Sequence, residues 1–193
     1  MFSRSVSRRG SLLGFFAGAA AGPFASGSYA APASSCGLVV LTVGGLVGAS
    51  NRPSFDAKRD RFFYHNNLDF KRAHAFTFAD LLAFPQQTVM LAEEGGETVF
   101  KGPFLGEVLA AANPPGEART ARLSALDGYA SEMTIETAKL ESWVLAVEAD
   151  GKAFGIGDLG PLYAVRPLPA GQRRTDEEDA RWVFSLYYIE LMP

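Results

Sequence analysis

The chain has 193 residues, of which 48% are hydrophobic and 20% are charged. This length suits one ordinary domain and is too short for two domains of typical size. Beyond residue 30 the chain carries 15 basic and 21 acidic residues, and this acidic balance argues against a protein that binds the nucleic-acid backbone.

The N-terminal segment carries the pattern of an export signal. No Asp or Glu precedes Asp56, and a moderately apolar, Gly/Ala-rich run extends from Ser11 to Ala25. The basic residues that precede this run are Arg4, Arg8 and Arg9. A basic region, an apolar region and small exit residues occur in the order typical of a signal peptide. The arginine pair, followed by two leucines, resembles the twin-arginine export motif. We therefore predict a twin-arginine-type signal over residues 1–30, one domain over residues 31–193, and a periplasmic location.

Two other interpretations of this segment stay open. Cleavage is expected near Ala30 or Ala33, but an uncleaved membrane anchor is the first alternative. Glycines and Pro23 interrupt the apolar run, which is shorter than the roughly 20 residues that a membrane span needs. The second alternative is lipid modification of Cys36, although no leucine precedes this cysteine at the expected distance. As Cys36 is the single cysteine of the chain, an internal disulfide is excluded.

The rest of the chain predicts many short strands and two short helices. Strands are expected over residues 38–47, 87–92, 98–101, 119–126, 129–135, 143–148, 160–165 and 182–191. Helices are expected over residues 78–84 and from Gly102-Pro103 to residue 112. Residues 51–67 are expected to form a loop or a short irregular strand, and residues 171–179 a polar loop. Strands outnumber helices without a regular βαβ alternation, so we predict a single α+β domain.

Local signals support several of these elements. Thr77 and Asp80 form a capping-box pattern at the start of the first helix. Proline at the first helical position predicts that Gly102-Pro103 opens the second helix. Seven residues are expected in the core, four on one helical face and three alternating along a strand. They are Phe104, Leu105, Val108, Leu109, Trp143, Leu145 and Val147.

The order of the motifs resembles the sulfite oxidase-like molybdopterin-binding domain family, over residues 76–190. The motifs are Phe78-Ala79-Asp80-Leu81-Leu82-Ala83-Phe84-Pro85, Phe100-Lys101-Gly102-Pro103-Phe104-Leu105, Leu109-Ala110-Ala111-Ala112, Ala125-Leu126-Asp127-Gly128-Tyr129, Val144-Leu145-Ala146, Gly160-Pro161-Leu162-Tyr163-Ala164-Val165-Arg166-Pro167 and Arg181-Trp182-Val183. The resemblance implies a mixed, β-rich fold with short helices. It also implies a molybdopterin-dependent oxidoreductase activity for catalytic members.

The resemblance also implies where a cofactor would bind. Arg181 and Trp182 match a family position where a basic residue precedes a tryptophan and helps to hold the pterin phosphate, although a solvated arginine beside a strand is the commoner explanation of a single arginine. Asp127 and Tyr129 belong to a turn that the family places at the same site, and an ordinary Asp-Gly turn is the alternative. Catalytic members bind molybdenum through a cysteine thiolate on the segment that here ends in Glu93 and Glu94. Carboxylates are hard oxygen donors and differ from a thiolate in their electronics.

The absence of the family's cysteine at this segment decides the function that we expect. No catalytic residue can be assigned, and neither a metal nor a molybdopterin cofactor is expected. The expected function is an exported module that binds an unknown small ligand or a periplasmic protein. The alternative is a molybdopterin-dependent oxidoreductase with altered metal ligation. We expect no nucleic-acid partner and no stable membrane span after signal cleavage. His65 and His74 are interpreted as two surface histidines, because too few ligands surround them for a metal site.

Overall fold

The computed structural model describes residues 37–93, 96–169, 172 and 174–193. These residues belong to one compact unit, Pro32–Pro193. The predicted signal over residues 1–30, its cleavage positions and Cys36 lie outside the described residues, so the corresponding expectations remain predictions.

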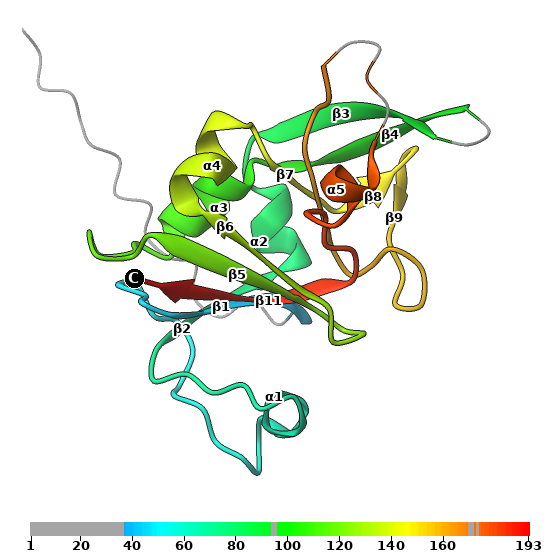
Figure 1. Cartoon of the computed structure of the whole chain (residues 1–193). Coiled ribbons are helices and arrows are strands. Elements are labelled where there is room, and N and C mark those ends of the chain that lie inside the picture. Colours follow the sequence, from blue (N-terminus) through cyan, green and yellow to red (C-terminus); the bar gives the residue numbers. More distant parts are fainter. Residues whose placement is uncertain (1–36, 94–95, 170–171, 173) are drawn as a thin grey trace, which may run out of the picture. The chain divides into compact units, whose positions relative to one another are not determined.

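The described chain is rich in strands and has a few short helices (Figure 1). The strands are β1 (Val39–Gly45), β2 (Ala73–Thr77), β3 (Gln86–Glu93), β4 (Gly96–Pro103), β5 (Thr120–Ala125), β6 (Ala130–Thr134), β7 (Val144–Ala146), β8 (Glu148–Ala149), β9 (Lys152–Ala153), β10 (Tyr163–Val165) and β11 (Leu186–Met192). The helices are α1 (Arg61–His65), α2 (Phe78–Leu82), α3 (Leu105–Ala111), α4 (Ile135–Leu140) and α5 (Asp176–Asp179). No described helix has both the length and the apolar character that a membrane span requires.

The strands form three sheets. A five-stranded sheet has the order β2-β1-β11-β5-β6, in which β1 and β11 are parallel and the other neighbours are antiparallel. A four-stranded antiparallel sheet has the order β3-β4-β8-β9, and β10 pairs with β7. Helices α2, α3 and α4 lie over one face of the five-stranded sheet (Figure 1). The predicted α+β class therefore holds for the described residues.

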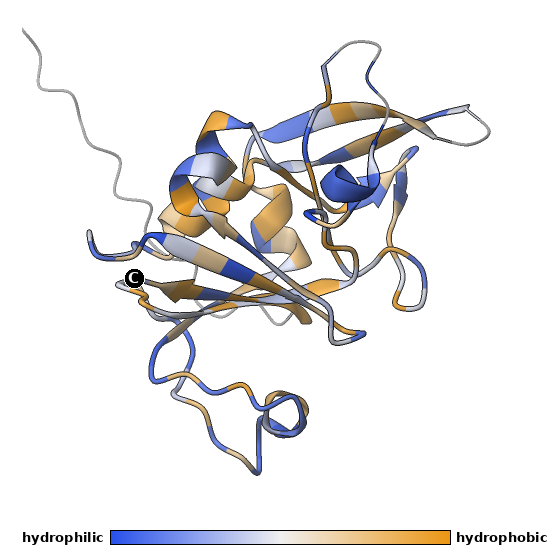
Figure 2. Ribbon diagram, viewed as in Figure 1, coloured by the Kyte–Doolittle hydropathy of each residue, from blue (hydrophilic) through white to orange (hydrophobic). Residues whose placement is uncertain are grey.

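Two apolar clusters cover the two faces of the five-stranded sheet. The main core joins Leu41 and Ile189 of the sheet with Leu109 of α3 and with Trp143, all fully buried. On the other face, Tyr187 and Tyr188 pack with aromatic residues of the segment 49–72. Figure 2 shows apolar residues concentrated in the strands and in the helices above the sheet, whereas α5 is hydrophilic. Burial on both faces is the reason that β11 is a nearly continuous apolar strand.

Several predicted elements are confirmed with small shifts of their ends. Helix α2 begins as expected, because Thr77 Oγ1 accepts a hydrogen bond from the Asp80 amide at 3.2 Å and Asp80 Oδ2 accepts one from the Thr77 amide at 2.8 Å. This reciprocal pair is the capping box. Six of the seven predicted core residues are fully buried, and Phe104 is partly buried against the same cluster.

The predicted start of the second helix is wrong. Gly102 and Pro103 end β4, where they pair with Gln87 and Gln86, and α3 begins at Leu105. The glycine serves close packing, since a Cβ atom at Gly102 would lie 2.0 Å from the carbonyl oxygen of Leu145. Proline is acceptable there because it stands at the end of a strand.

Three short helices and one division of a strand were not predicted. Helix α1 lies in the expected loop 51–67, α5 lies in the expected loop 171–179, and α4 follows directly after β6. Thr134 and Thr175 cap α4 and α5 through their side chains. The expected strand 143–148 divides into β7 and β8 in different sheets. Val144 and Ala146 are buried as well, so this strand is covered on both faces and the expected alternation is absent.

Candidate functional site

Arginine, tryptophan and glutamate side chains meet where α5 packs beside β10 and the start of β7. We call this group the arginine–tryptophan cluster. Its members are Glu141, Trp143, Tyr163, Arg166, Arg174, Glu178, Asp179, Arg181 and Trp182. Trp143 and Trp182 are buried, so the cluster has an apolar floor and a charged upper layer.

Glu178 is the centre of one half of the cluster. Its two carboxylate oxygens accept hydrogen bonds from Nε and Nη2 of Arg166, both at 2.6 Å. The indole Nε1 of Trp182 donates to the same carboxylate at 2.8 Å. The hydrogen bonds from Arg166 outweigh burial and hold the pKa of Glu178 below its usual range, while they raise the pKa of Arg166. A two-pronged pair of this kind is among the stronger polar contacts in proteins.

Glu141 holds the other half. Its Oε2 accepts a hydrogen bond from Arg181 Nη2 at 2.6 Å and one from the Trp143 indole at 3.0 Å. Arg166 Nε lies 3.6 Å from the same oxygen. Burial alone would raise the pKa of Glu141, but the hydrogen bonds from Arg181 and Trp143 outweigh it and hold this pKa below its usual range. Glu141 is therefore an ionised acceptor at neutral pH.

Arg174 closes the cluster on the side of β3. Its guanidinium lies over the ring of Trp182, 5.1 Å from the centroid, and Nη1 donates to Tyr163 Oη at 3.1 Å. Arg174 Nε also pairs with Asp179 at 3.0 Å. Three arginines therefore face three carboxylates of the same chain, so the positive charge that could meet an external anion is already matched.

The structure brings some of the predicted site residues together. Arg181 and Trp182 belong to the cluster, and the hydroxyl of Tyr129 donates to the carbonyl oxygen of Ala180, next to Arg181. Asp127 accepts a hydrogen bond from the Tyr129 amide at 2.9 Å, so its carboxylate shapes the turn. Glu93 ends β3 opposite Gly96, and Glu94 lies outside the described residues.

The end of β3 approaches the cluster, but little space remains between them. Leu91 and Ala92 line a hollow with Leu168, Arg174 and Trp182, and its volume is about 10 Å³. A void of this size holds about one water molecule. The predicted proximity of this strand end to Trp182 is observed, whereas the described side chains leave no room there for a larger group.

A roomier hollow lies elsewhere, between α3 and α4. Its volume is about 350 Å³, and its lining is mostly apolar. The lining residues are Phe104, Gly106, Glu107, Ala110, Ala138, Lys139 and Ser142. This volume is at the lower end of the range that small-molecule sites occupy. None of the predicted site residues lines it.

The described residues contain no group of three or more His, Cys, Asp and Glu side chains that could hold a metal ion. The expectation for the histidines needs one correction. His65 is exposed in α1, but His74 is buried in β2, where Nδ1 lies 2.9 Å from the carbonyl oxygen of Ala49. His74 is thus a structural residue of a covered strand.

Comparison with known proteins agrees with the fold and goes no further. No family model and no curated protein matches the sequence. Among solved structures, the crystal structure of the sulfane dehydrogenase SoxCD from Paracoccus pantotrophus matches with a TM-score of 0.52 and 19% identity. This chain shares its fold. The match covers 78% of this chain and 37% of the other, so this chain spans little more than a third of the SoxCD chain.

The likeness to SoxCD bears on the fold class that the sequence motifs predict. It supports a sulfite oxidase-like fold over the matched part of the chain. At 19% identity it carries no residue roles and no activity. Sequence reasoning singled out Arg181 and Trp182 but missed Glu141, Glu178 and Arg174. No motif marks these three residues, because the contacts that join them into one cluster, such as Arg181 with Glu141 across 40 positions, form only in the folded chain.

Proposed function

We propose that this chain is an exported module with a molybdopterin-binding-like fold that binds a small ligand or a protein partner and does not carry out molybdenum chemistry. The observation that carries the proposal is the internal pairing of Arg181 and Arg166 with Glu141 and Glu178, at distances down to 2.6 Å. A cofactor phosphate at Arg181 would have to displace the Glu141 carboxylate, because the two anions would compete for one guanidinium. The proposed export rests on the N-terminal sequence pattern alone.

The donor chemistry near the cluster does not fit a molybdenum centre. The chain has no cysteine after Cys36, so no thiolate of the described residues can reach the metal. The sequence has Glu93 and Glu94 where catalytic members of the resembled family carry the cysteine, and carboxylates are hard donors suited to different metals. An additional carboxylate would also repel an anionic pterin phosphate. The residues present therefore support a binding role more than a redox role.

The available space agrees with this conclusion. The hollow between Ala92 and Trp182 has a volume of about 10 Å³, far below that of a small-molecule site. The hollow between α3 and α4, at about 350 Å³, is the better candidate for a small ligand. Its apolar lining favours an apolar molecule, with Lys139 and Glu107 as polar contacts at its edge.

The second candidate function is an oxidoreductase that binds molybdopterin without a protein thiolate. The observation in its favour is the shared fold with a protein named as a sulfane dehydrogenase. Three arginines near Trp182 would also suit an anionic cofactor if the cofactor displaced the carboxylates of Glu141, Glu178 and Asp179. This candidate differs from the first in one measurable quantity, the molybdenum content of the purified protein.

Metal analysis separates the two candidates. We expect protein purified from cells that make molybdopterin to contain far less than one molybdenum atom per chain. We also expect no sulfite or sulfoxide turnover from the single variants Ala92→Cys, Glu93→Cys and Glu94→Cys, since the surrounding arginines stay paired. Lys152→Cys, at an exposed position in β9, controls for an added thiol. Stoichiometric molybdenum in the unaltered protein, or turnover gained at one of the three positions only, would favour the oxidoreductase.

Export has its own test. The exported protein is expected to begin near residue 31 or 34, because the basic start, the apolar run and the small exit residues occur in order. Replacing Arg8 and Arg9 together by lysine is expected to block export, whereas Arg4→Lys, outside the pair, leaves it intact. Intact-mass measurement of periplasmic protein gives the N-terminus. An N-terminus still at Met1 in exported material would contradict the predicted cleavage.

A further inference from the structure

Residues 49–72 form a long loop between β1 and β2 that includes α1 and is rich in basic residues. We call this segment the basic excursion. It contains six basic and three acidic residues, whereas residues 73–193 contain nine basic and 18 acidic residues. Figure 1 shows it projecting, with α1, from the face of the five-stranded sheet that is opposite α2, α3 and α4. The domain therefore has a basic projection on an acidic body.

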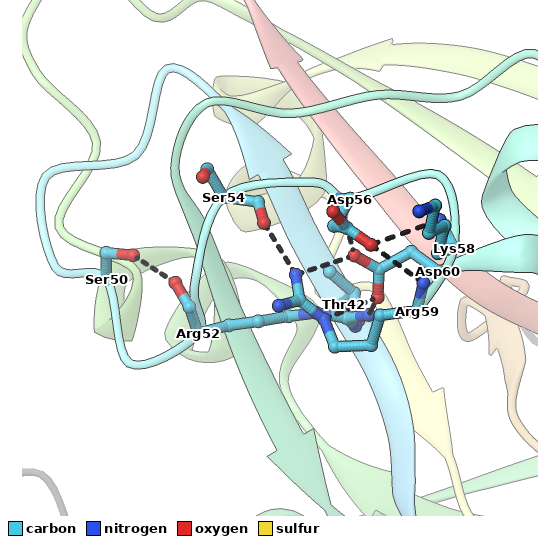
Figure 3. A network of polar contacts seen from close by, with 8 residues as sticks. All are labelled: Thr42, Ser50, Arg52, Ser54, Asp56, Lys58, Arg59 and Asp60. Carbon is cyan, nitrogen blue, oxygen red and sulfur yellow. Dashed lines mark hydrogen bonds and ion pairs between the residues drawn. The ribbon is translucent and has the colours of Figure 1, made fainter.

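A buried polar network fixes the base of the excursion to the sheet. Arg52 donates from Nη1 to Thr42 Oγ1 of β1 and from Nη2 to Asp60 Oδ1, both at 2.6 Å. Asp60 Oδ2 also accepts from Arg59 at 2.8 Å and from the Asp56 amide at 2.9 Å (Figure 3). The Asp60 side chain is only 3% exposed. These contacts hold both ends of the loop that precedes α1.

Aromatic packing fixes the rest of the excursion. The Arg52 guanidinium lies between Phe63 and Phe70, 4.9 and 5.0 Å from their ring centroids. The ring of Phe62 packs edge-on against Tyr187 of β11, with 5.0 Å between centroids. Helix α1 is thus held against the sheet by the side chains on its inner face. A surface built in this way loses little conformational freedom when it binds.

Several exposed cations of the excursion have no carboxylate partner within the described chain. Lys58, Arg61 and Lys71 are exposed and form no ion pair with any carboxylate of the described residues. In the same segment, Phe62 is 47% exposed and Tyr64 is 57% exposed. Unpaired cations beside half-exposed aromatic rings are the composition of surfaces that rest in the interface of a lipid bilayer.

We propose that the basic excursion docks the domain on an anionic lipid membrane. Lys58, Arg61 and Lys71 would meet the lipid headgroups, and the ring of Tyr64, the most exposed aromatic side chain of the excursion, would enter the interfacial layer. The anionic lipid surface would repel the acidic body of the domain. The domain would therefore dock with the basic excursion facing the lipid and with helices α2, α3 and α4 facing away from it. A projecting surface with dispersed charges suits a planar bilayer better than a partner that needs a matching cavity.

Vesicle co-sedimentation tests this proposal on the intact domain. We expect the protein to bind vesicles of phosphatidylglycerol and phosphatidylcholine at low ionic strength, and to bind pure phosphatidylcholine vesicles far more weakly. Added salt should release it, because exposed charges are screened. The double variant Lys58→Gln with Arg61→Gln should lower the partition coefficient about 30-fold, since each basic residue near an anionic surface contributes about a fivefold factor.

A matched control removes the same charge elsewhere. Arg119→Gln with Lys152→Gln changes two exposed cations outside the excursion and should leave vesicle binding unchanged. Tyr64→Ser should weaken binding by a smaller factor without loss of charge. Equal binding by the two double variants, or no preference for anionic vesicles, would overturn the proposal. Salt-sensitive self-association without lipid, lost in Lys58→Gln with Arg61→Gln, would also overturn it and assign the surface to a second copy of this chain.

Discussion

Replacing Leu109 with alanine is expected to lower the free energy of unfolding by about 2–5 kcal/mol. Leu109 is fully buried in α3 and belongs to the main core together with Leu105, Val108 and Trp143. The change removes three methylene-sized groups and leaves a cavity that the surrounding strands and helices fill only in part. Urea-induced unfolding of both proteins, followed by circular dichroism, measures the difference.

The exposed leucine of the neighbouring helix is the control for this experiment. Leu140 is 76% exposed at the end of α4, so Leu140→Ala should change the free energy of unfolding by less than about 0.5 kcal/mol. If Leu109→Ala were as mild as Leu140→Ala, the face of α3 that we assign to the core would be wrong.

Replacing Asp60 with asparagine is expected to destabilise the protein by about 2–4 kcal/mol at neutral pH. Asp60 has a buried carboxylate that faces Arg52 and Arg59, and the change leaves the Arg52 guanidinium between two aromatic rings without its anionic partner. Removing one member of a buried ion pair lowers the stability of the fold by more than the intact pair contributes to it, because the other charge stays buried without a partner. Denaturant unfolding gives the difference, and Asp69→Asn, at an exposed position of the same excursion, should be nearly neutral.

The same residue predicts how stability depends on pH. Burial by itself would raise the pKa of Asp60, but hydrogen bonds from Arg59, from the Asp56 amide and from Arg52 outweigh it and lower this pKa to about 2. A carboxyl group with a lowered pKa in the folded state stabilises it fully above its unfolded pKa of about 4 and loses that contribution as the pH falls through 2. Unfolding measured between pH 5 and pH 2 should therefore show a smaller decrease in stability for Asp60→Asn than for the unaltered protein. Parallel curves for the two proteins would show that Asp60 is not the group responsible.

Short-range chemistry explains the elements that the sequence predicted correctly. The capping box at Thr77 and Asp80 needs only residues three positions apart, and it starts α2 as expected. Local patterns failed in β7, where both faces are buried, so that buried and exposed residues do not alternate. They also failed at Gly102, which is needed for close packing against the backbone of Leu145 in β7.

The sequence by itself therefore determined the strand-rich α+β class, the apolar face of α3, the acidic balance and the positive charge of residues 49–72. Only the tertiary structure decided which charges remain available for binding. Arg181 pairs with Glu141, 40 positions away, and Arg166 pairs with Glu178, while Lys58 and Arg61 form no ion pair within the described chain. Ion pairing depends on distances of a few ångströms between side chains, and the pairing of distant strands sets those distances, so no local pattern contains them.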